Sequence, residues 1–184
     1  DLRDVSINGT NIDFSIENEY YKNVSFFLSI PAFYEATNAL IALTAYIYLR
    51  GNLFSKDYEL LKEGLKETVW EGRMQAVLDK VFIDGAHNPQ GVDELIKSAR
   101  AICKGEKASL LFSVVSDKNF DLMIKKICES KVFNNFFVTK IASARSVSEN
   151  LIKDTFEKYT KKPVIQFNNV NEAFKYAVEN KEDY

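Results

Sequence analysis

The most informative segment of the chain reads Val81-Phe82-Ile83-Asp84-Gly85-Ala86-His87-Asn88-Pro89-Gln90-Gly91. A short apolar strand is followed by a carboxylate, Asp84, and then by a glycine that permits a tight turn. Asn88 and Pro89 are the residue types that favour the N-cap and the first turn of a helix. The segment therefore predicts a strand, a loop that carries Asp84 and His87, and a helix that begins at Pro89.

The helix that follows the loop has one apolar face, so it is expected to pack on a sheet. We therefore expect Asp84 and His87 to lie at the carboxyl end of a parallel strand, beside a helix N-terminus that favours an anion. A carboxylate can accept hydrogen bonds from both hydroxyls of a ribose. The same residues are also common in ordinary turns and caps. The pattern alone indicates a loop that contacts a phosphate or a nucleotide, and nothing sharper.

Downstream of this loop, short apolar strands alternate with helices. Continuous apolar runs such as Phe136-Phe137-Val138 are typical of strands that are buried on both faces. The alternation predicts an α/β, Rossmann-like domain with a mostly parallel sheet and helices on both faces. The expected strands are 109–115, 136–141 and 164–167, and the expected helices are 89–103, 120–129, 147–159 and 170–178.

Upstream of the loop, the pattern is different. Alternating apolar residues on either side of Asn8-Gly9 predict a hairpin. The further expected elements are a strand at 24–30, helices at 31–49 and 56–68, and strands at 74–78 and 81–83. We expect a domain boundary between residues 69 and 70, because residues 1–69 hold too few strands to form a closed domain. The polar start without Met suggests a fragment of a longer protein.

Composition excludes several classes of protein. The 24 basic and 26 acidic side chains give a net charge of −2, which provides no footprint for nucleic acid. The longest apolar run is too short to span a membrane. The single histidine excludes a His-rich metal site, and no metal ligands are expected in this chain. Cys103 and Cys128 are expected to be free core thiols, and without a signal peptide we expect a cytoplasmic protein.

The segment Asp84-Gly85-Ala86-His87-Asn88-Pro89 resembles the signature of folylpolyglutamate synthase, including the bifunctional dihydrofolate synthase form. This family is the folate branch of the Mur ligase superfamily. The chain departs from other family motifs at Ala32, Glu35, Glu71 and Ala144. The segments that resemble further family motifs, in the family's order, are 34–39 ([HY]-Q-x-x-N-A), 70–74 (W-P-G-R-[FM]), 116–119 (a D-K-D turn) and Thr139 with Ala144-Arg145 (T…P-R).

The resemblance implies that residues 1–69 are the tail of a central P-loop ATPase domain and that residues 70–184 are a Mur-ligase-type C-terminal domain. It implies that Asn38 approaches the adenine or the phosphates of ATP and that Asp84 holds the ribose. Arg73 would reach the ATP phosphates across the domain interface, where a guanidinium is well suited to them.

The resemblance also implies a catalytic role for His87 and Arg73, with His87 near the nucleotide and the incoming amino acid. Lys118 and Arg145 would contact substrate. Each of these residues also has a purely structural interpretation, as a polar helix residue, an ion-pair partner or a loop residue, and the sequence leaves that open.

The implied reaction joins L-glutamate to folate, or to dihydropteroate, through an acyl phosphate formed with ATP. The sequence contains no G-x-x-x-x-G-K-[ST] motif. The P-loop and the Mg²⁺ ligands are therefore expected in an N-terminal ATPase domain of the same protein. The chain alone is expected to be inactive, and the intact enzyme is expected to be a monomer.

Three other interpretations remain open at this stage. The chain could belong to another Mur-type amino-acid ligase with a cell-wall precursor as acceptor. It could be a stand-alone nucleotide-binding α/β module. It could also be an interaction domain in which Trp70 and the many phenylalanines form a partner surface.

Overall fold

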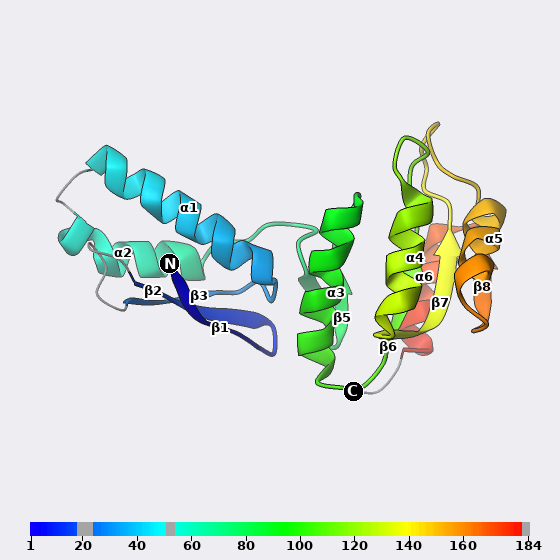
Figure 1. Cartoon of the computed structure of the whole chain (residues 1–184), viewed down its shortest axis with the longest axis horizontal. Helices are drawn as coiled ribbons and strands as arrows, with labels where there is room; N and C mark the ends of the chain where they lie inside the picture. The colour runs from blue at the N-terminus through cyan, green and yellow to red at the C-terminus, as the bar shows by residue number, and fades with distance from the viewer. Residues whose placement is uncertain (18–23, 51–53, 182–184) are drawn as a thin grey trace. The chain divides into compact units, whose positions relative to one another are not determined.

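The computed structural model describes residues 1–17, 24–50 and 54–181 (Figure 1). Its internal contacts divide the chain into two compact units, Asp1–Gly85 and Ala86–Tyr184. The predicted domain boundary between residues 69 and 70 lies upstream of this division and stays a prediction.

The first unit begins with a three-stranded antiparallel sheet. Its strands are β1 (Leu2–Asn8), β2 (Asn11–Ile16) and β3 (Val24–Leu28), in the order β1-β2-β3. Ile7 pairs with Ile12 across a tight turn in which Gly9 has φ +63°. This left-handed conformation is open to glycine at little cost, so the predicted hairpin is confirmed together with its turn.

Two helices, α1 (Phe33–Arg50) and α2 (Phe54–Lys66), cover one face of this sheet (Figure 1). The rings of Phe14 and Phe26 stack with centroids 5.8 Å apart, and Tyr58 of α2 meets Phe26 edge-on. Alternate residues of β2 face the helices, as the period of two requires. The buried apolar residues of this core are Ile12, Phe14, Ile16, Phe26, Leu28, Ala36, Ala39 and Leu43.

The strands β4 (Gln75–Leu78) and β5 (Val81–Ile83) form an antiparallel hairpin. The prediction that Asp84 follows a strand of the parallel sheet is therefore wrong for this structure, because β5 pairs with β4. Only Asp79 and Lys80 join the two strands, and Lys80 takes the left-handed turn conformation at φ +57°. A two-residue connection can join only antiparallel neighbours, whereas parallel strands need a long crossover.

The second unit contains a three-stranded parallel sheet with flanking helices, which confirms the α/β prediction. The strands are β6 (Ala108–Phe112), β7 (Phe133–Thr139) and β8 (Val164–Phe167), in the order β6-β7-β8. The helices are α3 (Pro89–Cys103), α4 (Phe120–Ser130), α5 (Glu149–Tyr159) and α6 (Val170–Glu179).

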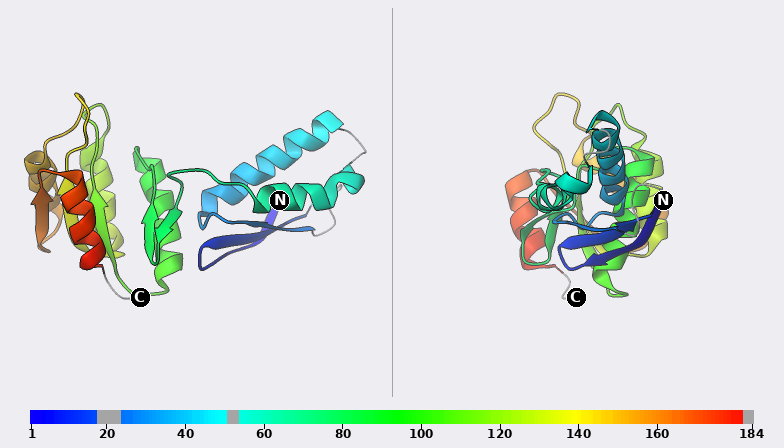
Figure 2. Two further views of the ribbon diagram at one scale, coloured as in Figure 1. Left: turned by 180° about the vertical axis from the view of Figure 1, so that it is seen from behind. Right: turned by 90° about the vertical axis from the view of Figure 1, so that its left-hand side faces the viewer.

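Helices cover both faces of this sheet, as the apolar runs predicted. Phe136 packs on Phe156 of α5 with centroids 5.1 Å apart, whereas the next residue, Phe137, packs on Tyr176 of α6 at 5.5 Å. Successive side chains of a strand point to opposite faces. The two views accordingly place α4 and α6 on opposite sides of the sheet (Figures 1 and 2).

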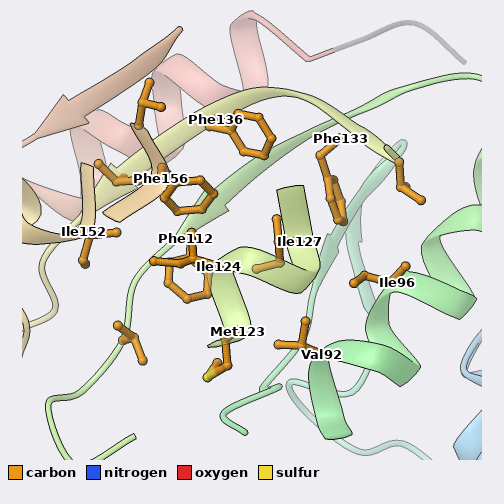
Figure 3. Packing of buried hydrophobic residues seen from close by; sticks show 14 of the residues in the cluster. Val92, Ile96, Phe112, Met123, Ile124, Ile127, Phe133, Phe136, Ile152 and Phe156 are labelled. Atoms are coloured by element: carbon orange, nitrogen blue, oxygen red, sulfur yellow. The ribbon is translucent and has the colours of Figure 1, made fainter. Parts of the chain in front are cut away.

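The core of the second unit lies between the sheet and helices α3, α4 and α5. Val92 and Ile96 of α3 point toward Met123 and Ile127 of α4 (Figure 3). Phe156 is fully buried and contacts rings from two strands of the sheet. This packing orients α3, and therefore the loop at its N-terminus, relative to α4.

Cys103 and Cys128 are free thiols, and burial raises the pKa of both, to about 11 for Cys128. None of the helices in the described ranges has the length and apolar character that a membrane span requires.

Candidate functional site

The Asp84 carboxylate directly follows β5 and is anchored by hydrogen bonds within the first unit. The Tyr34 hydroxyl donates to Oδ2 of Asp84 at 2.8 Å, and the backbone amide of Met74 donates to the same oxygen at 3.0 Å. Met74 is buried and adopts φ +41°, a left-handed conformation that is uncommon for a residue with a side chain. The backbone of the loop before β4 is thus shaped so that one amide points at the carboxylate.

The Tyr34 phenol remains protonated at neutral pH. Burial, followed by the negative charge of Asp84 and the hydrogen bond to it, raises the pKa of Tyr34 well above the ordinary value for tyrosine. Each of these influences disfavours the phenolate, and the opposite influence of the Arg73 charge is the weakest. Tyr34 is therefore a permanent donor to Asp84.

Arg73 lies in the same part of the first unit. The amide of Gly85 donates to the carbonyl of Gly72 at 2.7 Å, which ties the residue after Asp84 to the residue before Arg73. A Cβ added at Gly85 would lie 3.3 Å from that carbonyl and 3.4 Å from Nη1 of Arg73. Gly85 thus allows a close approach of the two loops, which places a guanidinium near the Asp84 segment.

Asn38 lies one turn after Tyr34 on α1. Its amide nitrogen donates to Oε2 of Glu35 at 3.2 Å. Glu35 is buried, whereas Asn38 is exposed. A carboxylate only accepts hydrogen bonds, so this contact sets which side of the Asn38 amide faces Glu35.

The other half of the sequence signature belongs to the second unit. Asn88 has an extended backbone, and its Oδ1 accepts from the amide of Gly91 at 2.7 Å; Pro89 occupies the first turn. These are the N-cap features that the sequence predicted. His87 precedes the cap and is exposed. The start of α3 therefore combines oriented backbone amides with a histidine, which suits contact with an anion.

Lys118 and Arg145 lie close together in the second unit, joined by Asp117. The Lys118 ammonium and Nη1 of Arg145 each lie 3.4 Å from Oδ2 of Asp117. The carbonyl of Arg145 also accepts from the amide of Ser116 at 2.8 Å. The loop after β6 and the loop after β7 thus present two cations at one place.

Asp117 is ionised over most of the pH range. Desolvation is the largest single influence and opposes ionisation. The hydrogen bond from its own backbone amide, with the charges of Lys118 and Arg145, outweighs it and lowers the pKa of Asp117 below its ordinary value.

Sequence reasoning assigned no role to three of these groups. They are the Tyr34 hydroxyl, the Met74 amide and the Asp117 carboxylate. Tyr34 opens the segment 34–39, whose resemblance to a family motif does not by itself indicate which acceptor its hydroxyl meets. The Met74 amide leaves no trace in sequence, because every residue except proline carries one. Within the described ranges no group of three or more His, Cys, Asp or Glu side chains is arranged to hold a metal ion.

Solved structures with this fold include a folylpolyglutamate synthase from Mycobacterium tuberculosis in complex with ADP and AMPPCP. It is 21% identical with a TM-score of 0.80, and the match covers 97% of this chain and 40% of that one. A UDP-N-acetylmuramate-alanine ligase from Thermotoga maritima matches with a TM-score of 0.69 at 18% identity, over 95% of this chain and 38% of that one. At these identities the likeness shows the fold.

Sequence similarity points to the same group of enzymes. A dihydrofolate synthase/folylpolyglutamate synthase from Bacillus subtilis is 29% identical over 122 residues, which are 65% of this chain and 28% of that protein. This chain thus spans less than a third of that relative. Residues 72–183 match the family described as "Mur ligase, glutamate ligase domain". Because this match takes in more than half of the sequence, the chain belongs to the Mur ligase family and carries its glutamate ligase domain.

Proposed function

We propose that this chain is the C-terminal part of an ATP-dependent amide ligase that adds L-glutamate to folate, and in a bifunctional form also to dihydropteroate. The observation that carries the proposal is the Asp84 carboxylate, held by Tyr34 and the Met74 amide within the Asp-Gly-Ala-His-Asn-Pro segment. Membership of the Mur ligase family supports ligation to an amino acid. The folate acceptor is suggested by the relative from Bacillus subtilis.

The nucleotide would be held by groups of the first unit. Asp84 would accept from the ribose hydroxyls, Arg73 would neutralise phosphate charge, and Asn38 would meet the adenine or the phosphates. The fit is chemically sound, because a carboxylate with oriented oxygens suits a diol and a guanidinium suits a phosphate. Relatives of known structure bind ADP and AMPPCP.

The substrates would meet groups of the second unit. His87, Lys118 and Arg145 would contact the acceptor or glutamate, and the two cations suit carboxylates. His87 and Arg73 would contribute to catalysis by placing positive charge and hydrogen-bond donors near the reacting groups.

In the reaction, a carboxylate oxygen of the acceptor attacks the γ-phosphorus of ATP and ADP leaves, which gives an acyl phosphate. The amine of L-glutamate then attacks the carbonyl carbon, loses a proton and expels phosphate. The residues of this chain would position the nucleotide and offset the charge on the transferring group.

The sequence lacks a P-loop, so the phosphate cradle and the Mg²⁺ ligands would come from an N-terminal ATPase domain of the same protein. Residues 1–69 would be the remainder of that domain, and the intact enzyme would be a cytoplasmic monomer. We expect no ATP-dependent glutamate ligation by the purified chain. Turnover by the chain alone would contradict this division of labour.

The first experiment titrates ATP into the chain by calorimetry. We expect weak binding by the wild type and at least a tenfold weaker affinity in Asp84→Ala, because hydrogen bonds to the ribose are lost. The control is Asp57→Ala, which removes a carboxylate that also accepts from a tyrosine, Tyr46, on α1. Equal affinities in the wild type and Asp84→Ala would remove Asp84 from the nucleotide site.

A second candidate is another Mur-type amino-acid ligase, since the fold of the UDP-N-acetylmuramate-alanine ligase matches over 95% of this chain. The two differ in the acceptor. The whole protein would be assayed with dihydropteroate or tetrahydrofolate and, in parallel, with a UDP-muramyl acceptor. Ligation of glutamate to the pteridine substrates alone would support the first proposal, and use of the muramyl acceptor alone would replace it.

A further inference from the structure

We propose that Tyr34 is a positioning residue that orients the Asp84 carboxylate and so makes this loop selective for a ribose over a 2′-deoxyribose. The inference rests on the proposed function, because it requires that Asp84 meets the sugar of a nucleotide. It adds a residue and a selectivity to that function.

Oδ2 of Asp84 accepts from donors in two separate segments of the chain. The Tyr34 hydroxyl and the Met74 amide both donate to Oδ2 of Asp84, at 2.8 and 3.0 Å. Donors that approach from different directions restrict the rotation of a carboxylate more than a single donor does, so the Tyr34 hydroxyl helps to set the direction of Oδ1.

The two donors come from distant parts of the sequence. Met74 immediately precedes β4, whereas Tyr34 lies in the first turn of α1, 50 residues before Asp84. The next two residues of α1, Glu35 and Ala36, are buried, so this turn of the helix is anchored in the first unit. The phenol is therefore held by the packing of α1 and acts as a fixed reference for the carboxylate.

Tyr34 also donates without interruption. Burial and the neighbouring Asp84 charge raise its pKa, which keeps the proton on the phenol throughout the physiological range. A hydroxyl that remained free to ionise would become an acceptor and would repel the carboxylate.

The orientation matters because a ribose offers two adjacent hydroxyls. A correctly turned carboxylate accepts from both, whereas a turned-away carboxylate keeps one bond at best. A 2′-deoxyribose has only one of these hydroxyls, so it gains little from the correct orientation. Loss of the Tyr34 hydroxyl should therefore weaken ATP binding more than 2′-deoxyATP binding.

The experiment titrates ATP and 2′-deoxyATP separately into the chain by calorimetry, in the wild type, Tyr34→Phe and Tyr46→Phe. Tyr46 is the matched control, because its hydroxyl donates to Oδ2 of Asp57 at 2.6 Å from the same helix. We expect the wild type to prefer ATP about tenfold, as one hydrogen bond to a charged acceptor allows. We expect the preference to fall close to one in Tyr34→Phe and to stay unchanged in Tyr46→Phe.

The outcomes separate this inference from the function on which it rests. A wild-type preference for ATP that Tyr34→Phe retains would overturn the positioning role while leaving nucleotide binding intact. A wild type that binds neither nucleotide would overturn the nucleotide site, and ribose selection with it. A loss of preference in Tyr46→Phe as large as in Tyr34→Phe would show a general effect of α1 and would also overturn the role.

A second measurement tests the pairing without any nucleotide. The NMR chemical shift of Cζ of Tyr34, the ring carbon that carries the hydroxyl, is followed as the pH is raised, in the wild type and in Asp84→Asn. Removal of the carboxylate charge should move the pKa of Tyr34 toward the ordinary value. An identical titration in both proteins would show that Tyr34 and Asp84 do not interact in solution.

Discussion

Two loops of this molecule have the same plan but use their carboxylates differently. Each runs from an apolar strand through an aspartate to an asparagine that caps a helix: Asp84 and Asn88 precede α3, and Asp117 and Asn119 precede α4. Asp84 accepts from a phenol and a backbone amide. Asp117 accepts from two cations, Lys118 and Arg145.

The two carboxylates differ in how rigidly their hydrogen-bond donors are held. The donors of Asp84 belong to packed elements and cannot follow the carboxylate if it moves. Lys118 and Arg145 have long side chains, so they could rearrange around Asp117 or bind another anion in its place. The comparison suggests that the first loop is built to hold one geometry and that the second loop is built to exchange partners.

The largest expected effect is on stability at the first loop. Asp84→Ala should lower the free energy of unfolding by about 2 kcal/mol, since the half-buried Tyr34 hydroxyl and the amide of the buried Met74 lose their acceptor. Asp117→Ala should cost clearly less, because its partners stay solvated. Urea unfolding followed by the fluorescence of Trp70, the single tryptophan, would measure the first variant, and circular dichroism would measure both. Equal losses would remove the distinction between the loops.

The helix caps should differ in the same direction by a smaller amount. Asn88→Ala should cost about 1 kcal/mol, because Oδ1 accepts at 2.7 Å from a cap residue with an extended backbone. Asn119→Ala should cost less, since its hydrogen bond is 3.3 Å long and its backbone is not extended. Hydrogen exchange of the Gly91 and Leu122 amides would report each cap separately. A larger increase in the exchange rate of Leu122 in Asn119→Ala than of Gly91 in Asn88→Ala would contradict the predicted order of the two caps.

The smallest effects should appear in the pH dependence of stability, on opposite sides of neutrality. The pKa of Asp117 is lowered on folding, so its contribution is present above about pH 4 and is lost as the pH falls further. The pKa of Tyr34 is raised on folding, so its contribution is present below about pH 10 and is lost as the pH rises further.

Denaturation at graded pH would test both directions. Asp117→Asn should reduce the loss of unfolding free energy at acid pH only in part. The reason is that the pKa of Asp121 is also lowered, chiefly by its hydrogen bond from Tyr159. Tyr34→Phe should reduce the loss of unfolding free energy on the alkaline side, again only in part, because the pKa values of Tyr46 and Tyr159 are also raised, chiefly by their hydrogen bonds to aspartates. An alkaline profile that is the same in the wild type and Tyr34→Phe would contradict the buried, hydrogen-bonded phenol.

Helix α3 shows how far local sequence patterns reach. Its bounds, its Asn88 cap and its Pro89 start agree with the prediction, because an amphipathic face and a cap are encoded within a few residues. The hairpin around Gly9 agrees for a similar reason. Strand ends were less accurate: β6 ends at Phe112, and Val115 forms only an isolated bridge with Ser146. Where a strand ends depends on its neighbour, which local pattern does not reveal.

The candidate site likewise combines residues that the sequence indicates with contacts that only the folded chain creates. Asp84 and His87 could be selected from the sequence because they lie in one recognisable segment, and Arg73 because residues 70–74 resemble a family motif; their proposed roles remain to be tested. The antiparallel pairing of β5 could have been inferred from the two-residue connection between the expected strands. The convergence of Tyr34 and the Met74 amide on one oxygen could not be anticipated. These contacts join groups up to 50 residues apart, and one of them uses a backbone amide. Local chemistry therefore specified the helices, the caps and the chemical groups, whereas chain folding alone selected which donors meet Asp84, because such contacts exist only once distant segments pack together.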